Sequence, residues 1–75
     1  MNFEKALTHI KCGDKLCRAG WNGENQYVYL DNMYVKQDPS IRVDLIIFID
    51  NNKLPNPGWT PTTKELFSDD WEIVE

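Results

Sequence analysis

Three tryptophans, each beside a predicted turn, are the residues of this sequence best suited to bind a ligand. Trp21 lies in the run Gly20-Trp21-Asn22-Gly23, Trp59 follows a glycine, and Trp71 follows two aspartates. An indole at a strand end offers a flat face for stacking a purine, and a neighbouring Asn or Asp can bond to the edge of that base. Alternatively, all three rings fill the ends of a small core. The core alternative has at least equal weight for Trp59, whereas the glycines around Trp21 favour a ligand because they let backbone approach closely.

Arg18 is the natural partner for an anion near Trp21, because it comes directly before that turn. A guanidinium group offers two parallel N–H donors to a phosphate. The same group could instead form a surface ion pair with one of the 12 acidic residues. The sequence leaves these two roles open.

Catalytic chemistry is not expected from this sequence. His9 lies beside the apolar stripe of a predicted helix with no partner motif, and neither Cys12 nor Cys17 adjoins a histidine. One histidine and two cysteines cannot supply the usual four zinc ligands, so both thiols are predicted to be buried small hydrophobes. The acidic cluster in 69–72 lacks the spacing of a calcium loop and is predicted to be a solvated corner. We therefore expect no enzyme, no metal and no cofactor.

Length and charge restrict the partners further. The chain has 75 residues and a mass of 8.8 kDa, which predicts one domain over residues 1–75. Its net charge of −4 disfavours DNA, RNA and anionic lipid as partners. The longest apolar run, 45–49, is far short of the ~20 residues that span a bilayer, and the first residues do not resemble a signal peptide. We expect a cytoplasmic protein.

The elements that must position these side chains begin with a helix over residues 3–11. Apolar residues at i, i+3, i+4 and i+7 form one stripe there. Asn2 is predicted as its N-cap and Gly13 as the left-handed residue after its end. The residues of the stripe are Phe3, Ala6, Leu7 and Ile10.

The rest of the chain predicts strands and one short helix. Asp31-Asn32 is predicted as a two-residue hairpin turn, 37–40 as a break, and 54–58 as an irregular loop because of its prolines and glycine. Thr60-Pro61 predicts the start of a short helix that ends at Phe67. The predicted strands are 15–19, 26–30, 33–36, 42–49 and 71–74.

This order predicts an α+β fold in which an N-terminal helix packs on a small antiparallel sheet of about five strands, with a short helix before the last strand. The run 45–49 is apolar on both faces, so its strand needs cover on both. One helix covers one face only. We therefore predict a homo-oligomer whose interface uses this sheet.

The sequence resembles the Thoeris anti-defence two family of phage and prophage proteins over nearly its whole length. The R-x-G-W-N-G turn and the terminal D-W-x-I-V strand are specific when they occur together. The full pattern is Met1-x-Phe3, Arg18-x-Gly20-Trp21-Asn22-Gly23, Tyr27-x-Tyr29-Leu30, Gly58-Trp59-x-Pro61-Thr62 and Leu66-x-x-x-Asp70-Trp71-x-Ile73-Val74.

The resemblance implies a protein that sequesters cyclic ADP-ribose-type immune signalling nucleotides, such as glycocyclic ADP-ribose, without degrading them. It also implies homo-oligomers, with a tetramer favoured over a dimer and with ligand pockets between protomers. Carried over by motif, Trp21 and Trp71 would stack the base, while Asn22 and Asp70 would bond to its polar edges. Arg18 would face the pyrophosphate, and Trp59 is a weaker ligand residue. The segment 37–42 is shorter than in many relatives, which puts in doubt a second ligand site and the tetramer.

Three alternatives of different kinds stay open. The protein could inhibit a host defence protein directly, in the manner of an anti-CRISPR protein that occupies a nuclease such as Cas9. It could sequester cyclic oligonucleotides of another defence system. It could also be an accessory domain whose tryptophans all belong to the core, in which case nucleotide would leave tryptophan fluorescence unaltered.

Overall fold

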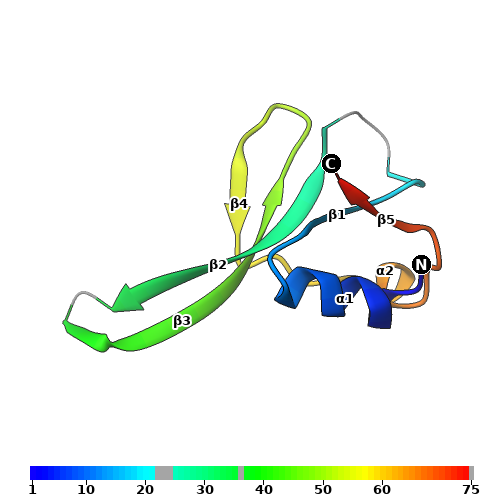
Figure 1. The fold of residues 1–75 in the computed structure, drawn as a ribbon. Coiled ribbons are helices and arrows are strands. Elements are labelled where there is room, and N and C mark those ends of the chain that lie inside the picture. The colour runs from blue at the N-terminus through cyan, green and yellow to red at the C-terminus, as the bar shows by residue number, and fades with distance from the viewer. Residues whose placement is uncertain (22–24, 36, 75) are drawn as a thin grey trace.

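The computed structural model describes residues 1–21, 25–35 and 37–74, and these form a helix packed on a five-stranded antiparallel sheet (Figure 1). The strands lie in the order β4-β3-β2-β1-β5. This arrangement confirms the predicted α+β fold, including the short helix before the last strand. The elements in chain order are α1 (Phe3–Lys11), β1 (Lys15–Arg18), β2 (Tyr27–Val35), β3 (Asp38–Ile49), β4 (Pro55–Pro57), α2 (Thr63–Leu66) and β5 (Trp71–Val74).

The helix α1 has the bounds and both end residues that its sequence predicts. Asn2 Oδ1 accepts a hydrogen bond from the Lys5 amide at 2.9 Å, which is N-cap geometry. Gly13 has φ of 95°, the left-handed conformation that ends a helix without a Cβ penalty. Ala6 and Ile10 of the apolar stripe are buried against the sheet.

One face of the sheet carries the core. Leu16 of β1 pairs with Val28 of β2 and with Ile73 of β5, so these side chains share a face. Both helices lie on this side of the sheet (Figure 1). The buried cluster between the helices and the sheet consists of Ala6, Ile10, Leu16, Val28 and Trp71.

The strands β2 and β3 form a long two-stranded arm, and the predicted turn at Asp31-Asn32 is wrong. Asp31 pairs with Leu45 and Asn32 with Asp44 in an unbroken antiparallel ladder. The predicted break over 37–40 is confirmed in part. Gln37 lies in a turn, and the register shifts where Tyr34 pairs with Arg42 and Val35 with Asp38, although β3 already begins at Asp38. Continuous pairing supplies a partner for the backbone on both strands, and this outweighs the local turn preference of an Asp-Asn pair. The arm extends well past the end of β1 (Figure 1).

The predicted loop at 54–58 contains a strand, β4, at the edge of the sheet. Its two prolines, Pro55 and Pro57, pair with Ile49 and Ile47. Proline is compatible with an edge strand because the side facing solvent needs no N–H donor. Asn56 between them adds a side-chain bond, since its Nδ2 donates to the Phe48 carbonyl oxygen at 3.2 Å.

The helix α2 begins two residues later than Thr60-Pro61 predicts. Thr62 is the N-cap, and Glu65 completes a capping box in which each side chain accepts the other's backbone N–H. The distances are 2.8 Å from the Thr62 amide to Glu65 Oε1 and 3.3 Å from the Glu65 amide to Thr62 Oγ1. A reciprocal cap satisfies two backbone donors, whereas Thr60 would satisfy one, so the start at Thr62 is favoured.

Candidate functional site

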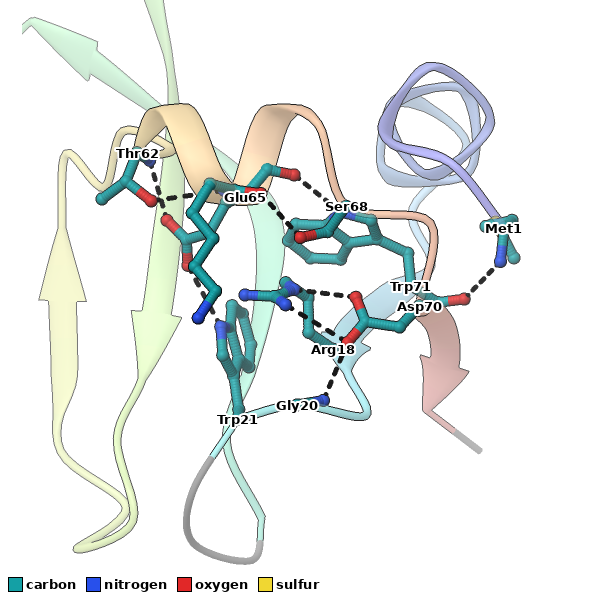
Figure 2. Close-up of polar contacts among 10 residues, drawn as sticks. Met1, Arg18, Gly20, Trp21, Thr62, Glu65, Ser68, Asp70 and Trp71 are labelled. Carbon is teal, nitrogen blue, oxygen red and sulfur yellow. Dashed lines mark hydrogen bonds and ion pairs between the residues drawn. The ribbon is translucent and has the colours of Figure 1, made fainter.

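The end of β1 and the start of β5 bring the predicted site residues together. Arg18 pairs with Trp71 across the two strands, and the Ala19 amide donates to the Asp70 carbonyl oxygen at 3.0 Å. Antiparallel pairing therefore joins two motifs that are far apart in the sequence. Figure 2 shows the resulting cluster, which the short helix α2 covers from one side.

Asp70 binds both Arg18 and the turn that follows it. Arg18 Nε donates to Asp70 Oδ1 at 2.8 Å and Nη2 donates to Oδ2 at 3.2 Å, while the Gly20 amide donates to the same Oδ2 at 2.9 Å (Figure 2). A Cβ on Gly20 would lie 2.9 Å from that oxygen, so glycine is the residue that fits there. Of the two roles left open for Arg18, the ion pair is the one observed, and phosphate binding stays a prediction.

Each group of this ion pair favours the charged form of the other. The hydrogen bond from Arg18, with that from the Gly20 amide, lowers the pKa of the Asp70 carboxyl below its ordinary value. The bond to Asp70 likewise raises the pKa of Arg18. The Arg18 side chain is only 9% exposed and that of Asp70 is 29% exposed. Both groups are thus charged at neutral pH, and the pair holds the start of the turn against β5.

Trp21 is a half-buried aromatic residue of the site. Its backbone amide donates to the Arg18 carbonyl oxygen at 3.1 Å, and its indole Nε1 donates to Glu65 Oε2 at 3.1 Å. The ring packs edge-on against Phe48 and Trp71, with centroids 5.5 and 5.4 Å away. The residue as a whole is only partly buried, whereas stacking of a ligand would require a face of the ring to be accessible.

Trp71 is a core residue in this structure, with 1% of its surface exposed. Its ring lies 5.3 Å from Phe3 and 5.4 Å from Trp21, and its Nε1 donates to the Glu65 carbonyl oxygen at 3.0 Å. Stacking of a base on Trp71 stays a prediction, and it would require one of these neighbours to move.

Trp59 completes the aromatic cluster. It is half-buried, its ring lies 6.4 Å from both Trp21 and Trp71, and its amide donates to the Ile46 carbonyl oxygen at 2.9 Å. These contacts agree with the core role considered for it. The structure therefore brings together Arg18, Trp21, Asp70, Trp71 and Trp59, while Asn22 lies outside the described residues.

Glu65 is the residue of this cluster that sequence reasoning missed. It contacts the indole N–H groups of both Trp21 and Trp71. The T-x-x-E spacing of Thr62 and Glu65 could have indicated a capping box and so the position of α2. Nothing in the sequence indicates that the same carboxylate reaches Trp21, which is 44 residues away.

The other candidate groups lie apart from this cluster. His9 Nδ1 lies 2.9 Å from Asp14 Oδ2 at the end of α1. Cys12 is exposed, so its predicted burial is wrong, because it is the C-cap residue on the solvent side of α1. Burial, with the charge of Glu72, raises the pKa of the half-buried Cys17 thiol and disfavours its reactive form. Over 1–21, 25–35 and 37–74, no three metal-ligating side chains converge.

The described part of the chain contains no helix that is long and apolar enough to cross a membrane. The fold and the cluster define a small α+β protein in which the half-buried Trp21 is bonded to a glutamate on α2 and lies beside an arginine–aspartate ion pair. The model of the family described as Thoeris anti-defense 2-like domain matches residues 1–74, so the chain belongs to the Thoeris anti-defense 2-like family. A curated relative is Thoeris anti-defense 2 of Bacillus phage SP01. It is 28% identical over an alignment 89 residues long, gaps included, which covers 99% of this chain and 94% of the relative.

Proposed function

We propose that this protein binds cyclic ADP-ribose-type signalling nucleotides, of which glycocyclic ADP-ribose is the test case, and holds them intact in the host cytoplasm. Membership of an anti-defence family supports a role against Thoeris defence. The observation that carries the proposal is the half-buried ring of Trp21, fixed at its edge by Glu65 and beside the Arg18–Asp70 pair. These groups offer stacking and directional hydrogen bonds, which suit a nucleotide and require no bond to be broken.

The geometry supports a specific placement of the ligand. The base would stack on the open part of Trp21, with Asn22 and Asp70 at its polar edges. Arg18 uses Nε and Nη2 for Asp70, so a pyrophosphate would bind the remaining N–H groups, which it reaches only through the 9% of this side chain that is exposed. Trp71 would pack against Trp21 on the side of the core and so form the buried end of the site. Because the net charge is −4, affinity would come from these short-range contacts and not from long-range attraction.

We also propose that the site is completed in a homo-oligomer, with a tetramer favoured over a dimer. The sheet face away from α1 carries Tyr27, Tyr29 and Ile47, since Tyr27 pairs with Ile49 and Tyr29 with Ile47. The same face continues along the arm through Val43 and Ile41, which are 42% and 48% exposed. A second copy would cover this surface and could place its own residues near Trp21.

The experiment that tests the proposal separates binding from degradation. Purified protein is incubated with glycocyclic ADP-ribose and passed through a filter that retains the protein, and the filtrate is assayed with the Thoeris effector. We expect the filtrate to lose its activity and to regain it after the retained protein is heated. Mass spectrometry of the released nucleotide should show an unchanged mass and retention time.

Trp21→Ala is the variant to compare with wild type in this experiment, because Trp21 is half-buried. Trp71 is 1% exposed, so its replacement would disturb the core as well as the site. We expect binding to weaken by ~1–3 kcal/mol, the usual contribution of one stacked base. Trp59→Ala serves as the comparison and should weaken binding less. Unchanged affinity in Trp21→Ala would remove that residue from the site.

Two other results would replace the proposal. A released nucleotide that is cleaved or isomerised would show an enzyme. A filtrate whose activity never falls would favour direct inhibition of a host defence protein, and a pull-down with Cas9 or from defence-positive cells would then identify the partner. Retention of a cyclic oligonucleotide in the same assay, with none of glycocyclic ADP-ribose, would change the ligand class.

A further inference from the structure

Glu65 links the helix α2 to Trp21 and Trp71, two of the three tryptophans of the candidate site. Its Oε2 accepts from Trp21 Nε1 at 3.1 Å, and its backbone oxygen accepts from Trp71 Nε1 at 3.0 Å (Figure 2). Its second carboxylate oxygen, Oε1, accepts from the Thr62 amide at 2.8 Å. One residue on a four-residue helix thus fixes the edge of the half-buried ring and the edge of the buried ring below it.

We propose that Glu65 is a positioning residue, which orients the Trp21 ring for ligand stacking. This inference rests on the proposed function, since it assigns Trp21 the stacking role. The half-buried ring has edge contacts with other aromatic residues, and such contacts allow a range of tilts. The bond to Glu65 Oε2 selects one orientation, because an indole has a single N–H donor in a fixed direction.

A carboxylate is required in this position because two donors point at it. The Thr62 amide and the Trp21 indole each need an acceptor oxygen, and a carboxylate supplies two. A glutamine side chain has one acceptor oxygen and one NH₂ group, so one of the two donors would face another donor. Glu65→Gln therefore keeps the size of the side chain and loses one of the two bonds.

Thr62→Ala is a matched control within the same capping box. It removes the hydroxyl that accepts the Glu65 amide at 3.3 Å. It keeps the Thr62 backbone amide, so both carboxylate bonds of Glu65 stay in place. Loss of an N-cap hydroxyl lowers stability without altering the contact to Trp21.

The experiment compares wild type, Glu65→Gln and Thr62→Ala by calorimetric binding of glycocyclic ADP-ribose and by the indole N–H signals in ¹⁵N–¹H spectra. For Glu65→Gln we expect about tenfold weaker binding, as for one lost bond, and a shifted Trp21 indole signal. For Thr62→Ala we expect a lower melting temperature, unchanged affinity and an unshifted Trp21 signal. This combination separates positioning from a general loss of stability.

The outcomes separate this inference from the proposed function. Wild-type affinity in Glu65→Gln with a shifted Trp21 indole signal, or in Glu65→Leu, which leaves the Trp21 indole without this acceptor, would overturn the role of Glu65 and leave the sequestration proposal standing. Failure of the wild type to bind the nucleotide would overturn the proposed function and, with it, the ligand-orienting role. If Glu65→Gln does not fold, Glu65→Asp is used, because its carboxylate is one methylene too short to reach both donors. Wild-type affinity in that variant would overturn the inference.

Discussion

At the scale of single residues, Asp70 determines where the turn with Trp21 lies. Its carboxylate accepts hydrogen bonds from two nitrogens of the Arg18 guanidinium and from the Gly20 amide. These are the donor types that would bind a phosphate, a guanidinium fork and a glycine amide. In this chain they bind an internal carboxylate 52 residues from Arg18. The ion pair thus joins the two motifs by which the sequence resembles its family.

The lowered pKa of Asp70 also makes the free energy of unfolding depend on pH. Its pKa in the folded protein lies below the ordinary value, because Arg18 and Gly20 bind the charged form. A carboxyl of this kind stabilises the fold above its unfolded pKa of ~3.9 and loses that contribution as pH falls through the folded pKa. We expect Asp70→Asn to be less stable than wild type at pH 7, and the difference to shrink below about pH 4. Urea unfolding at several pH values measures it.

The pH dependence of wild type alone does not isolate Asp70, because other carboxyls with a lowered pKa also lose their stabilising effect as pH falls. Comparison with Asp70→Asn isolates it. Hydrogen bonds lower the pKa of Asp38, through Ser40, and of Asp50, through the Leu54 amide. Both residues are present in wild type and in Asp70→Asn, so their contributions cancel in the difference. A difference that stays constant from pH 7 to pH 3 would contradict the role assigned to the Asp70 charge.

The types of the site residues could be predicted from the sequence, but their burial and their partners could not. Trp21, Arg18 and Asp70 are recognisable because stacking and ion-pair chemistry belong to the residue type. The burial of Trp71 depends on Phe3 and α2, which reach it only after folding. Contacts across 44 or 52 residues leave no local pattern.

At the scale of elements, the predicted helices and strands agree with the structure where the sequence signal lies in or beside the element itself. The sequence predicts α1 at its observed bounds because the apolar periodicity and the flanking residues Asn2 and Gly13 are all local signals. The sequence does not predict the arm, because the backbone of Asp31 and Asn32 pairs with the partner strand β3. The strand β4 is likewise defined by its partner strand and not by its proline-rich composition.

Asn56 holds β4 on the sheet, and this predicts the effect of its removal. Its Nδ2 donates to the Phe48 oxygen at 3.2 Å, the Leu54 oxygen at 3.1 Å and Asp50 Oδ2 at 3.3 Å. We expect Asn56→Ala to lower the free energy of unfolding by about 1 kcal/mol, the net contribution of a hydrogen bond. Urea unfolding measures it, with Asn51→Ala in the exposed turn as the control. Equal effects of the two substitutions would contradict this role of Asn56.

At the scale of the whole molecule, the two faces of the sheet differ in what covers them. The face with Leu16 and Val28 lies under α1 and α2. The opposite face carries alternate residues of β3, and its apolar side chains continue from the body into the arm. A strand that is apolar on both faces is stable when both faces are covered. Ile47 is already buried within one chain, at 9% exposure, so the exposed part of this face lies along the arm at Ile41 and Val43. The residues of β3 on this face are Ile41, Val43, Leu45, Ile47 and Ile49.

A pair of isoleucines on opposite faces provides the test of self-association. Ile41 on the uncovered face is 48% exposed, and Ile73 on the face of α1 is 42% exposed. We expect Ile41→Glu to weaken self-association at least tenfold, because a charge would be buried without a partner at the interface, whereas Ile73→Glu should leave it unchanged. Sedimentation equilibrium over a range of concentrations measures both variants and the wild type. A monomeric wild type, or equal effects of the two substitutions, would show that this face is not the interface, and the ligand site would then have to be complete within one chain.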